Sequence, residues 1–341
     1  MKILIAVLIL LMIPQLYYFR KERFYKSLLM ASKYFKRLTI KEDESNEDLL
    51  LTNTDGNDIF VRIYKAENPK ALVQLVHGMG EHGGNYDHFA KYLAKNGYLV
   101  AVSDHRGHGK SLSNTYPNGY MQRAEELVDD QVMLSKYLKE TYPEKKLYML
   151  GHSMGSMVVR LFLRKNDKLI DKLIVTGTVP GNPIAGLGVF FLNILCFYFG
   201  EKHESGIIDY IVGTGKGIDF ISFDQENIRI KANDPLRISN FSLAYSRALI
   251  ELNQKLTKAR SYEVKNPDLE IYNLVGESDP ITKGPKGVKS SLDFLKKLGY
   301  KNIKSKVYKN MKHEVLNETD KEIVYQDIID IFDNKDLKYW N

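Results

Sequence analysis

The stretch that decides the fold covers residues 146–164 and reads KLYMLGHSMGSMVVRLFLR. Its first five residues form a short apolar run that predicts a buried strand, and its last part has the apolar spacing of a helix. Between them lies Gly151-His152-Ser153-Met154-Gly155, a G-x-S-x-G motif. A sharp strand-to-helix turn at such a motif exposes the serine hydroxyl and requires glycine where the backbone is crowded. The context predicts a nucleophile elbow at Ser153; the alternative is a glycine-rich turn with an idle serine.

Short apolar segments alternate with helical patterns on both sides of this stretch. This alternation predicts an α/β fold with a mostly parallel sheet, because helices connect parallel strands and cover both faces of the sheet. Asp55-Gly56 is typical of a hairpin turn and adds antiparallel strands at one edge. The predicted strands are 49–53, 59–64, 71–76, 98–102, 146–150, 169–175, 269–275 and 303–308, and the predicted helices are 86–95, 127–142, 154–164, 288–298 and 321–332.

The alternation stops between residues 179 and about 265, which predicts an inserted cap. This region contains the most apolar internal segment of the chain, LGVFFLNILCFYF at residues 187–199. Such a segment can line a tunnel for an acyl chain, contact a membrane, or simply pack between cap and core. The sequence leaves these three interpretations open.

The loop after the predicted strand 71–76 reads His77-Gly78-Met79-Gly80-Glu81-His82. A loop of small residues in this position can direct backbone N–H groups at a developing negative charge. We expect the Met79 N–H and the Met154 N–H to form an oxyanion hole. His77 and His82 are expected to make local hydrogen bonds, because their spacing with His88 fits no standard zinc pattern.

A serine nucleophile needs a histidine base that is oriented by an acid. On this fold the base follows the serine in the chain, and only His203 and His313 do so. His313 follows the predicted strand 303–308, whereas His203 lies inside the cap, so we predict His313. The acid is expected after the strand 269–275, where Asp279 is favoured and Glu277 is the alternative.

A further polar loop reads Asp104-His105-Arg106-Gly107-His108-Gly109-Lys110-Ser111 and follows the predicted strand 98–102. Its histidines precede Ser153, so the chain order excludes them as the base. We expect this loop to support the oxyanion loop through hydrogen bonds.

Charge is concentrated at the N-terminus. The chain of 341 residues has a formal net charge of +7, and residues 1–40 contain eight basic residues and one acidic residue. The remaining residues are therefore formally neutral, which argues against a nucleic-acid partner, since such affinity rests on neutralising phosphates. Cys196 is the single cysteine, so no disulfide can form within the chain.

Residues 3–19 are nearly all apolar and are just long enough to span a bilayer. Bulky Tyr17, Tyr18 and Phe19 precede Arg20-Lys21, and no small-residue cleavage site follows the apolar run, which favours an uncleaved anchor. Basic residues after the run place the catalytic domain in the cytoplasm by the positive-inside rule. The alternative is a signal peptide and a secreted protein.

Residues 19–37 carry aromatic and leucine residues at helical spacing among basic ones. They are typical of an amphipathic helix on an anionic membrane surface or of a solvated linker helix. The acidic run that starts at Lys41 marks a boundary. We therefore expect residues 1–40 to form an anchor with a basic amphipathic segment, and residues 41–341 to form the globular domain.

Taken together, the motifs resemble the α/β-hydrolases of the monoacylglycerol lipase and lysophospholipase group, among the serine aminopeptidase S33-type hydrolases. The similarity covers roughly residues 50–335, and residues 219–236 are also similar to the cap of bacterial members. The resemblance implies a Ser–Asp–His triad, an oxyanion hole and a cap after the sixth core strand. Two features depart from the family pattern: Met79 is bulky where a small residue is usual, and the N-terminal anchor is additional.

The resemblance implies a serine esterase that cleaves a single-chain lipid ester and needs no metal or cofactor. The apolar cap segment and the anchor favour a substrate derived from a membrane. One alternative is an aminopeptidase of the same fold, which needs acidic cap groups to hold the substrate amine; the candidates are Glu201, Glu204 and Asp209. Another is a non-catalytic binding protein. The oligomeric state is left open.

Overall fold

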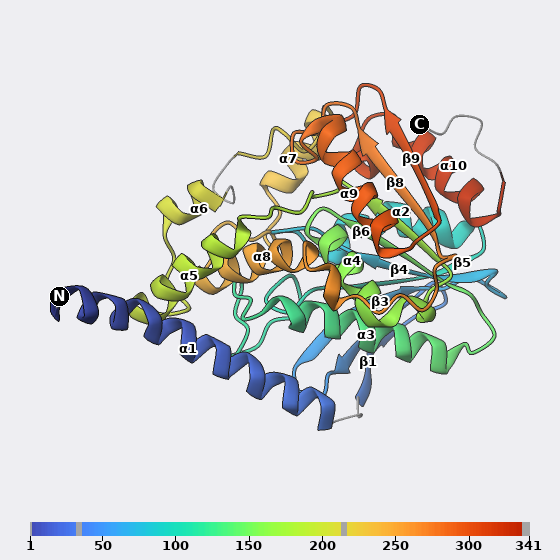
Figure 1. Cartoon of the computed structure of the whole chain (residues 1–341). Coiled ribbons are helices and arrows are strands. Elements are labelled where there is room, and N and C mark those ends of the chain that lie inside the picture. The colour runs from blue at the N-terminus through green and yellow to red at the C-terminus, as the bar shows by residue number, and fades with distance from the viewer. Residues whose placement is uncertain (1, 32–35, 213–216, 336–341) are drawn as a thin grey trace.

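The computed structural model describes residues 2–31, 36–212 and 217–335. Within these residues nine strands form one sheet in the order β1-β2-β3-β5-β4-β6-β7-β8-β9 (Figure 1). The strands from β4 to β9 pair in parallel, while β1, β2, β3 and β5 pair antiparallel in succession. The strands are β1 (Lys36–Glu42), β2 (Asn46–Thr52), β3 (Asp58–Tyr64), β4 (Ala71–Val76), β5 (Tyr98–Ser103), β6 (Leu147–His152), β7 (Lys172–Thr176), β8 (Glu270–Gly276) and β9 (Asn302–Tyr308).

Helices cover both faces of the sheet. One face packs against α2 and α10 through residues such as Phe89 and Ile328, and the other packs against α3 and α4 through residues such as Leu134 and Val158. The helices of the chain are α1 (Lys2–Ala31), α2 (Asp87–Lys95), α3 (Ala124–Thr141), α4 (Met154–Asn166), α5 (Ala185–Phe199), α6 (Gly206–Val212), α7 (Gln225–Ala232), α8 (Leu243–Leu256), α9 (Gly284–Leu298) and α10 (Lys321–Phe332). The predicted α/β fold, with a mostly parallel sheet and an antiparallel edge, is confirmed.

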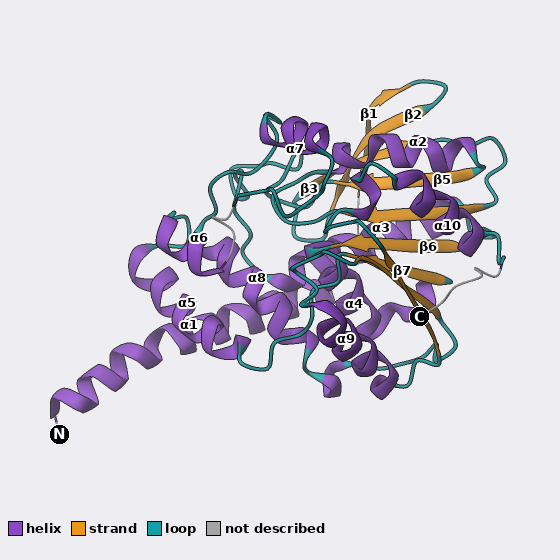
Figure 2. Cartoon of the chain, turned by 90° about the horizontal axis from the view of Figure 1, so that it is seen from above, coloured by secondary structure: helices purple, strands orange, loops and turns teal. Residues whose placement is uncertain are grey.

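A cap lies between β7 and β8 and consists of α5, α6, α7 and α8. Figure 2 shows α5, α6 and α8 gathered beside the sheet, with α1 running along the same side of the molecule. Helix α8 packs on α4 through buried residues such as Leu252 and Leu256. The cap is thus held against the helix that begins at Ser153.

The N-terminal segment differs from the prediction in one respect. Strand β1 pairs with β2 from Lys36 to Glu42, so the expected boundary after residue 40 falls inside a strand. The acidic run forms the turn of this hairpin, where the Asp43 side chain accepts hydrogen bonds from the backbone N–H groups of Ser45 and Asn46. Acidic residues favour such a turn because their short side chains satisfy local backbone donors. The middle of the acidic run, residues 43–45, therefore forms the turn between β1 and β2.

Helix α1 is bound to the globular body along one face. Gln15 accepts a hydrogen bond from Asn193 and donates one to the Phe190 carbonyl, both on α5. Further along, the Tyr25 hydroxyl donates to Asp129 of α3 at 3.0 Å. The N-terminal end of α1 extends beyond the body (Figure 1). The residues of α1 that hold it to the body are thus its polar and aromatic ones.

Helix α4 approaches β4 very closely at Gly155. A Cβ atom on Gly155 would lie 2.2 Å from the Val76 carbonyl oxygen and 2.6 Å from the His77 carbonyl oxygen. Backbone atoms cannot move aside as a flexible side chain can. Glycine is therefore required where the helix leaves the elbow.

We expect Gly155→Ala to lower the free energy of unfolding by about 1–3 kcal/mol or more, as overpacking does. Gly206→Ala is the matched control, because nothing lies within 4 Å of a Cβ placed there. The check is urea unfolding of both variants beside the wild type. Equal midpoints for the two variants would contradict the steric role of Gly155.

Candidate active site

Ser153 occupies a strained turn between β6 and α4. Its backbone has φ 52° and ψ −116°, a conformation that a residue with a side chain rarely adopts. The Ser153 N–H donates to the Thr176 carbonyl at 3.0 Å and so ties the turn to β7. The strain directs the hydroxyl away from the sheet, as a nucleophile elbow requires.

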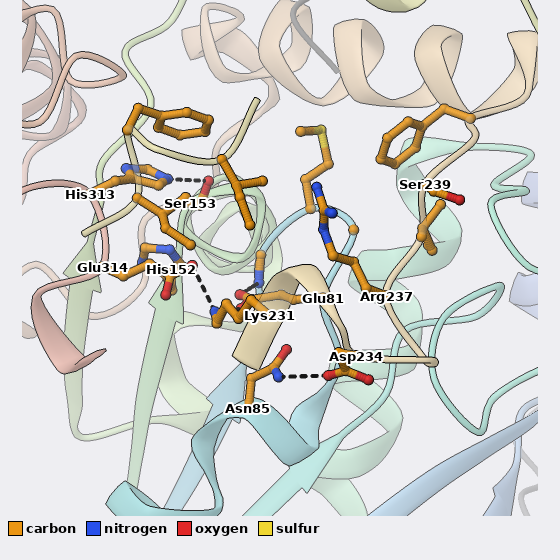
Figure 3. A pocket seen from close by; sticks show the side chains of 18 residues that line it. Glu81, Asn85, His152, Ser153, Lys231, Asp234, Arg237, Ser239, His313 and Glu314 are labelled. Carbon is orange, nitrogen blue, oxygen red and sulfur yellow. Dashed lines mark hydrogen bonds and ion pairs between the residues drawn. The ribbon is translucent and has the colours of Figure 1, made fainter. Parts of the chain in front are cut away.

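Three residues from three loops form one hydrogen-bonded chain, and Figure 3 shows the part of it between Ser153 and His313. The Ser153 Oγ and the His313 Nε2 are 2.8 Å apart, and the His313 Nδ1 and the Asp279 Oδ2 are 2.9 Å apart. These distances fit a serine that donates to a neutral imidazole and an imidazole that donates to a carboxylate. The loops follow β6, β8 and β9, so the parallel sheet brings them to the same edge.

The two sequence alternatives lie elsewhere. Glu277 is exposed, and His203 is an exposed residue of the cap whose ring lies 6.2 Å from that of Phe199. By contrast, Asp279 and His313 are both buried. The Asp279 carboxylate also accepts the Ile281 N–H at 2.8 Å, which holds it in place for His313.

Two backbone N–H groups close to Ser153, those of Met79 and Met154, have no acceptor among the described residues. On the loop after β4, the N–H of Gly78 donates to Glu81 and the N–H of Gly80 donates to the Tyr245 hydroxyl. Within the described residues, the N–H of Met79 between them has no acceptor, and neither does that of Met154 at the start of α4. Free N–H groups at a helix start and in a tight loop suit an oxyanion.

The loop after β5 is hydrogen-bonded to the loop after β4, as predicted. The His105 N–H donates to His77 Nε2 at 2.9 Å, and the Gly83 N–H donates to the Asp104 carboxylate at 2.7 Å. Burial lowers the pKa of His105 to about 4, so this imidazole stays neutral at ordinary pH. These interactions hold the oxyanion loop in its shape.

A buried ionic cluster connects the cap to both catalytic loops. Lys231 of α7 donates to Glu81 at 2.8 Å and to Glu314 at 2.7 Å. Glu81 belongs to the oxyanion loop, where it also accepts from Gly78, and Glu314 directly follows His313. One ammonium group thus links the oxyanion loop, the loop of the base and the cap.

The attraction between the Lys231 ammonium and the nearby carboxylates determines the pKa values in this cluster. Burial alone would raise the pKa of Glu81, but Lys231 lowers it to about 2. Burial alone would lower the pKa of Lys231, but Glu314 and Glu81 raise it above its usual value. Glu81 and Lys231 are therefore both charged at neutral pH, because each charge is stabilised by an opposite one.

The pocket above Ser153 is lined by apolar cap residues. Phe220 lies beside the imidazole of His313, with ring centroids 5.7 Å apart. The ring of His152 lies beside that of His313, and burial lowers the pKa of His152 to about 4, so this imidazole is neutral at ordinary pH. The apolar side chains that line the pocket are Met79, Ile218, Phe220, Ile221, Ile238 and Phe241. Such a lining suits a substrate with an apolar part.

Sequence reasoning did not find the ionic cluster or Tyr245. Lys231 lies within the segment 219–236 that is similar to the cap of bacterial members, but that similarity implied no role for it, and no pattern marks Tyr245 in its cap helix. The Tyr245 hydroxyl nonetheless contacts the oxyanion loop through Gly80 and the β5 loop through His108. Glu81, an acidic residue in the loop after β4, was the one sequence feature that could have indicated a buried cationic partner.

A comparison with protein families matches residues 67–320 to the family described as serine aminopeptidase, S33. The chain belongs to this family. The chain is similar to a monoacylglycerol lipase of Mycolicibacterium smegmatis, with 26% identity over 76% of this chain and 87% of that protein. It is also similar to lysophospholipase L2 of Escherichia coli strain K12, with 28% identity over 53% of this chain and 57% of that protein.

A solved structure of this fold is also similar. The carboxyl esterase of Bacillus coagulans, in complex with glycerol, has a TM-score of 0.75 and 25% identity over 89% of this chain and 99% of that chain. The matched regions of the viral and rodent monoglyceride lipases are shorter and span about half of those proteins, 44–49% of their length. The S33 family assignment agrees with the fold and with the resemblance stated from the motifs.

We expect Lys231→Met to lower the free energy of unfolding by about 3–5 kcal/mol, because it leaves two carboxylates buried without a counter-charge. The triple variant E81Q/K231M/E314Q should regain much of this loss. Lys289→Met is the control, since Lys289 and its partner Asp293 are exposed on α9 and should contribute little. Guanidinium unfolding at neutral pH gives the comparison; equal stability of K231M and K289M would contradict the role of the cluster.

Proposed function

We propose that this chain is a serine ester hydrolase that cleaves the carboxylic ester of a single-chain lipid, a monoacylglycerol or a lysophospholipid. The observation that carries the proposal is the chain of hydrogen bonds from Ser153 through His313 to Asp279, beside the free N–H groups of Met79 and Met154. The apolar lining of the pocket and the similarity to lipid esterases of the S33 family support a lipid substrate.

In the first half of the reaction the Ser153 Oγ attacks the ester carbonyl carbon while His313 Nε2 takes the hydroxyl proton. Asp279 holds the Nδ1–H and stabilises the imidazolium that forms. The carbonyl oxygen becomes an oxyanion and accepts hydrogen bonds from the Met79 and Met154 N–H groups. The C–O bond of the ester then breaks, and the leaving alcohol takes the proton from His313 Nε2.

In the second half, water attacks the acyl-enzyme while His313 Nε2 accepts a proton from it. The same two N–H groups stabilise the second oxyanion. Breaking the bond to Ser153 Oγ releases the fatty acid, and the proton on His313 returns to the serine. The complete reaction consumes one water molecule for each ester that is cleaved.

The aminopeptidase alternative has less support. The sequence indicated Glu201 as a residue that could hold a substrate amine, but its carboxylate binds Lys21 of α1 at 2.7 Å. Glu201, Glu204 and Asp209 are all absent from the lining of the pocket. The carboxylates that do line the pocket are engaged: Glu81 and Glu314 bind Lys231, and Asp234 binds His82 at 2.9 Å. A substrate ammonium would have to compete with these partners.

Fluorophosphonate should label the wild type at Ser153, and Ser153→Ala should lose both the label and ester turnover, by a factor on the order of 10⁶. Asp279→Asn should lower kcat by about 10⁴-fold through the wrong histidine tautomer. Glu277→Gln is the matched control and should turn over substrate like the wild type. Labelling in gels and hydrolysis of a medium-chain monoacylglycerol check these results.

An unlabelled wild type would sink the hydrolase proposal and favour a non-catalytic binding protein. Faster turnover of aminoacyl arylamides than of long-chain monoacyl esters would favour the aminopeptidase. Loss of activity in Glu277→Gln would indicate that Glu277, and not Asp279, is the acid that orients His313.

We further propose that α1, α5 and α6 form a membrane-facing surface. The segment Lys2–Tyr25 of α1 is long enough and apolar enough to cross a membrane. The face of α1 that is turned away from the body is apolar, and so are the outer faces of α5 and α6. The exposed side chains include Ile9, Leu16, Phe24, Phe191, Phe199, Ile207 and Tyr210.

The arrangement of these helices supports one shared lipid environment. Both views place α1 next to α5, with α6 on the same side of the molecule (Figures 1 and 2). Gln15, the polar residue within the apolar run, is paired with α5 and not exposed to lipid. Large exposed apolar patches of this kind are rare on soluble monomers and mark membrane or protein contacts.

The double variant I9D/L16D should lose most of its binding to vesicles, because each aspartate places a charge on the lipid-facing side of α1. Ile323→Asp is the matched control, since Ile323 is equally exposed on α10. Flotation of the full-length protein with phosphatidylglycerol vesicles gives the measurement. If I9D/L16D floats as well as I323D, the membrane role of α1 is wrong.

A further inference from the structure

Arg237 stands in the cap segment between α7 and α8, at the mouth of the pocket. The next residue, Ile238, donates its N–H to the Gly80 carbonyl at 3.0 Å, which fastens this segment to the oxyanion loop. Both Arg237 and Met79 line the pocket that contains Ser153. In Figure 3 the Arg237 side chain enters from the side opposite His313, and its guanidinium points toward the middle of the pocket.

The guanidinium of Arg237 is partly buried and has no hydrogen-bond or ion-pair partner anywhere in the described part of the chain. This sets it apart from other arginines. Each of the others that is buried or partly buried in the described residues donates to a carboxylate or a carbonyl: Arg62, Arg106, Arg123, Arg160, Arg164 and Arg247. Arg237 therefore carries unsatisfied donors next to the catalytic serine.

The other charged groups of the pocket already have partners. Lys231 is bound between Glu81 and Glu314. Asp234, three residues before Arg237, accepts from His82, from Asn85 and from the Leu236 N–H. Of the charged side chains that line the pocket in the described part of the chain, Arg237 alone is left to bind a charge on a substrate.

A guanidinium presents its donors in a planar fork that matches the two oxygens of a phosphate or carboxylate. A lysophospholipid carries a phosphodiester on the same glycerol as its acyl ester, so both groups can occupy one small pocket. A monoacylglycerol presents only neutral hydroxyls there, which leave the charge of Arg237 unmatched. A phosphate adds the attraction of its opposite charge and can accept two parallel hydrogen bonds from the guanidinium, whereas a hydroxyl offers neither.

We propose that Arg237 binds the phosphate of the substrate head group and makes lysophospholipids the preferred substrates of this site, a proposal that rests on the proposed esterase function. The phosphate is bound in the ground state and in the transition state alike. Loss of Arg237 should therefore raise KM for the phosphate-bearing substrate and leave kcat nearly unchanged.

The test compares wild type, Arg237→Gln and Arg237→Lys on two substrates with the same acyl chain, lauroyl lysophosphatidylglycerol and monolauroylglycerol, both kept monomeric. Arg237→Gln should lower kcat/KM for the lysophospholipid by about 10- to 100-fold, as expected for a lost hydrogen bond to a charged group. In Arg237→Gln, kcat/KM for monolauroylglycerol should change less than about threefold. In Arg237→Lys, kcat/KM for the lysophospholipid should be intermediate, because lysine lacks the planar fork of donors.

Arg229→Gln is the matched control, because Arg229 is exposed on α7 and pairs with Glu226, away from the pocket. An equal effect of Arg237→Gln on both substrates, or none on either, would overturn the inference. Inorganic phosphate, added as a competitor, should inhibit the wild type only weakly; inhibition that matches the affinity for the lysophospholipid would assign a phosphate-ion site instead of a head-group site. If the wild type cleaves neither substrate nor p-nitrophenyl butyrate, the proposed esterase function fails, and if it cleaves monolauroylglycerol alone, only the role of Arg237 fails.

Discussion

The close approach of α4 to β4 is the constraint on which the site depends. A Cβ atom on Gly155 would collide with the carbonyl oxygens of Val76 and His77, so the helix that begins after Ser153 can pack this closely against the end of β4 only with glycine there. The strained backbone of Ser153, which has a positive φ, lies directly before this close approach, where the chain turns sharply to enter the helix. Strain of this kind persists only where the surrounding structure determines it. Here the surrounding parallel strands do so.

A second level of organisation connects the cap to the catalytic loops. The hydrolase sheet brings Ser153, Asp279 and His313 to one edge, but it does not determine how the loops lie relative to the cap. Lys231 supplies that connection, since a single buried ammonium binds carboxylates from both the oxyanion loop and the loop of the base. Cap position and active-site geometry are therefore coupled through charge, whereas the core is held together by apolar packing.

The N-terminal helix extends the molecule in a different direction. Its polar and aromatic residues bind the cap and α3, and its apolar residues remain outside. This is the reverse of an ordinary surface helix, which buries its apolar face. This exposed apolar face supports the membrane contact that we propose for α1, α5 and α6.

The sequence alone determined the alternation of strands and helices, the elbow, and the residues that the structure brings together as Ser153, Asp279 and His313. Each follows from a local pattern, either an apolar period or a motif at the end of a predicted strand. It did not predict β1, because a short exposed edge strand has no apolar period. Only the tertiary structure decided that Lys231 lies between Glu81 and Glu314 and that Arg237 is unpaired at the pocket. These contacts join segments that are far apart in the chain, so no local sequence pattern indicates which charged residues pair after folding.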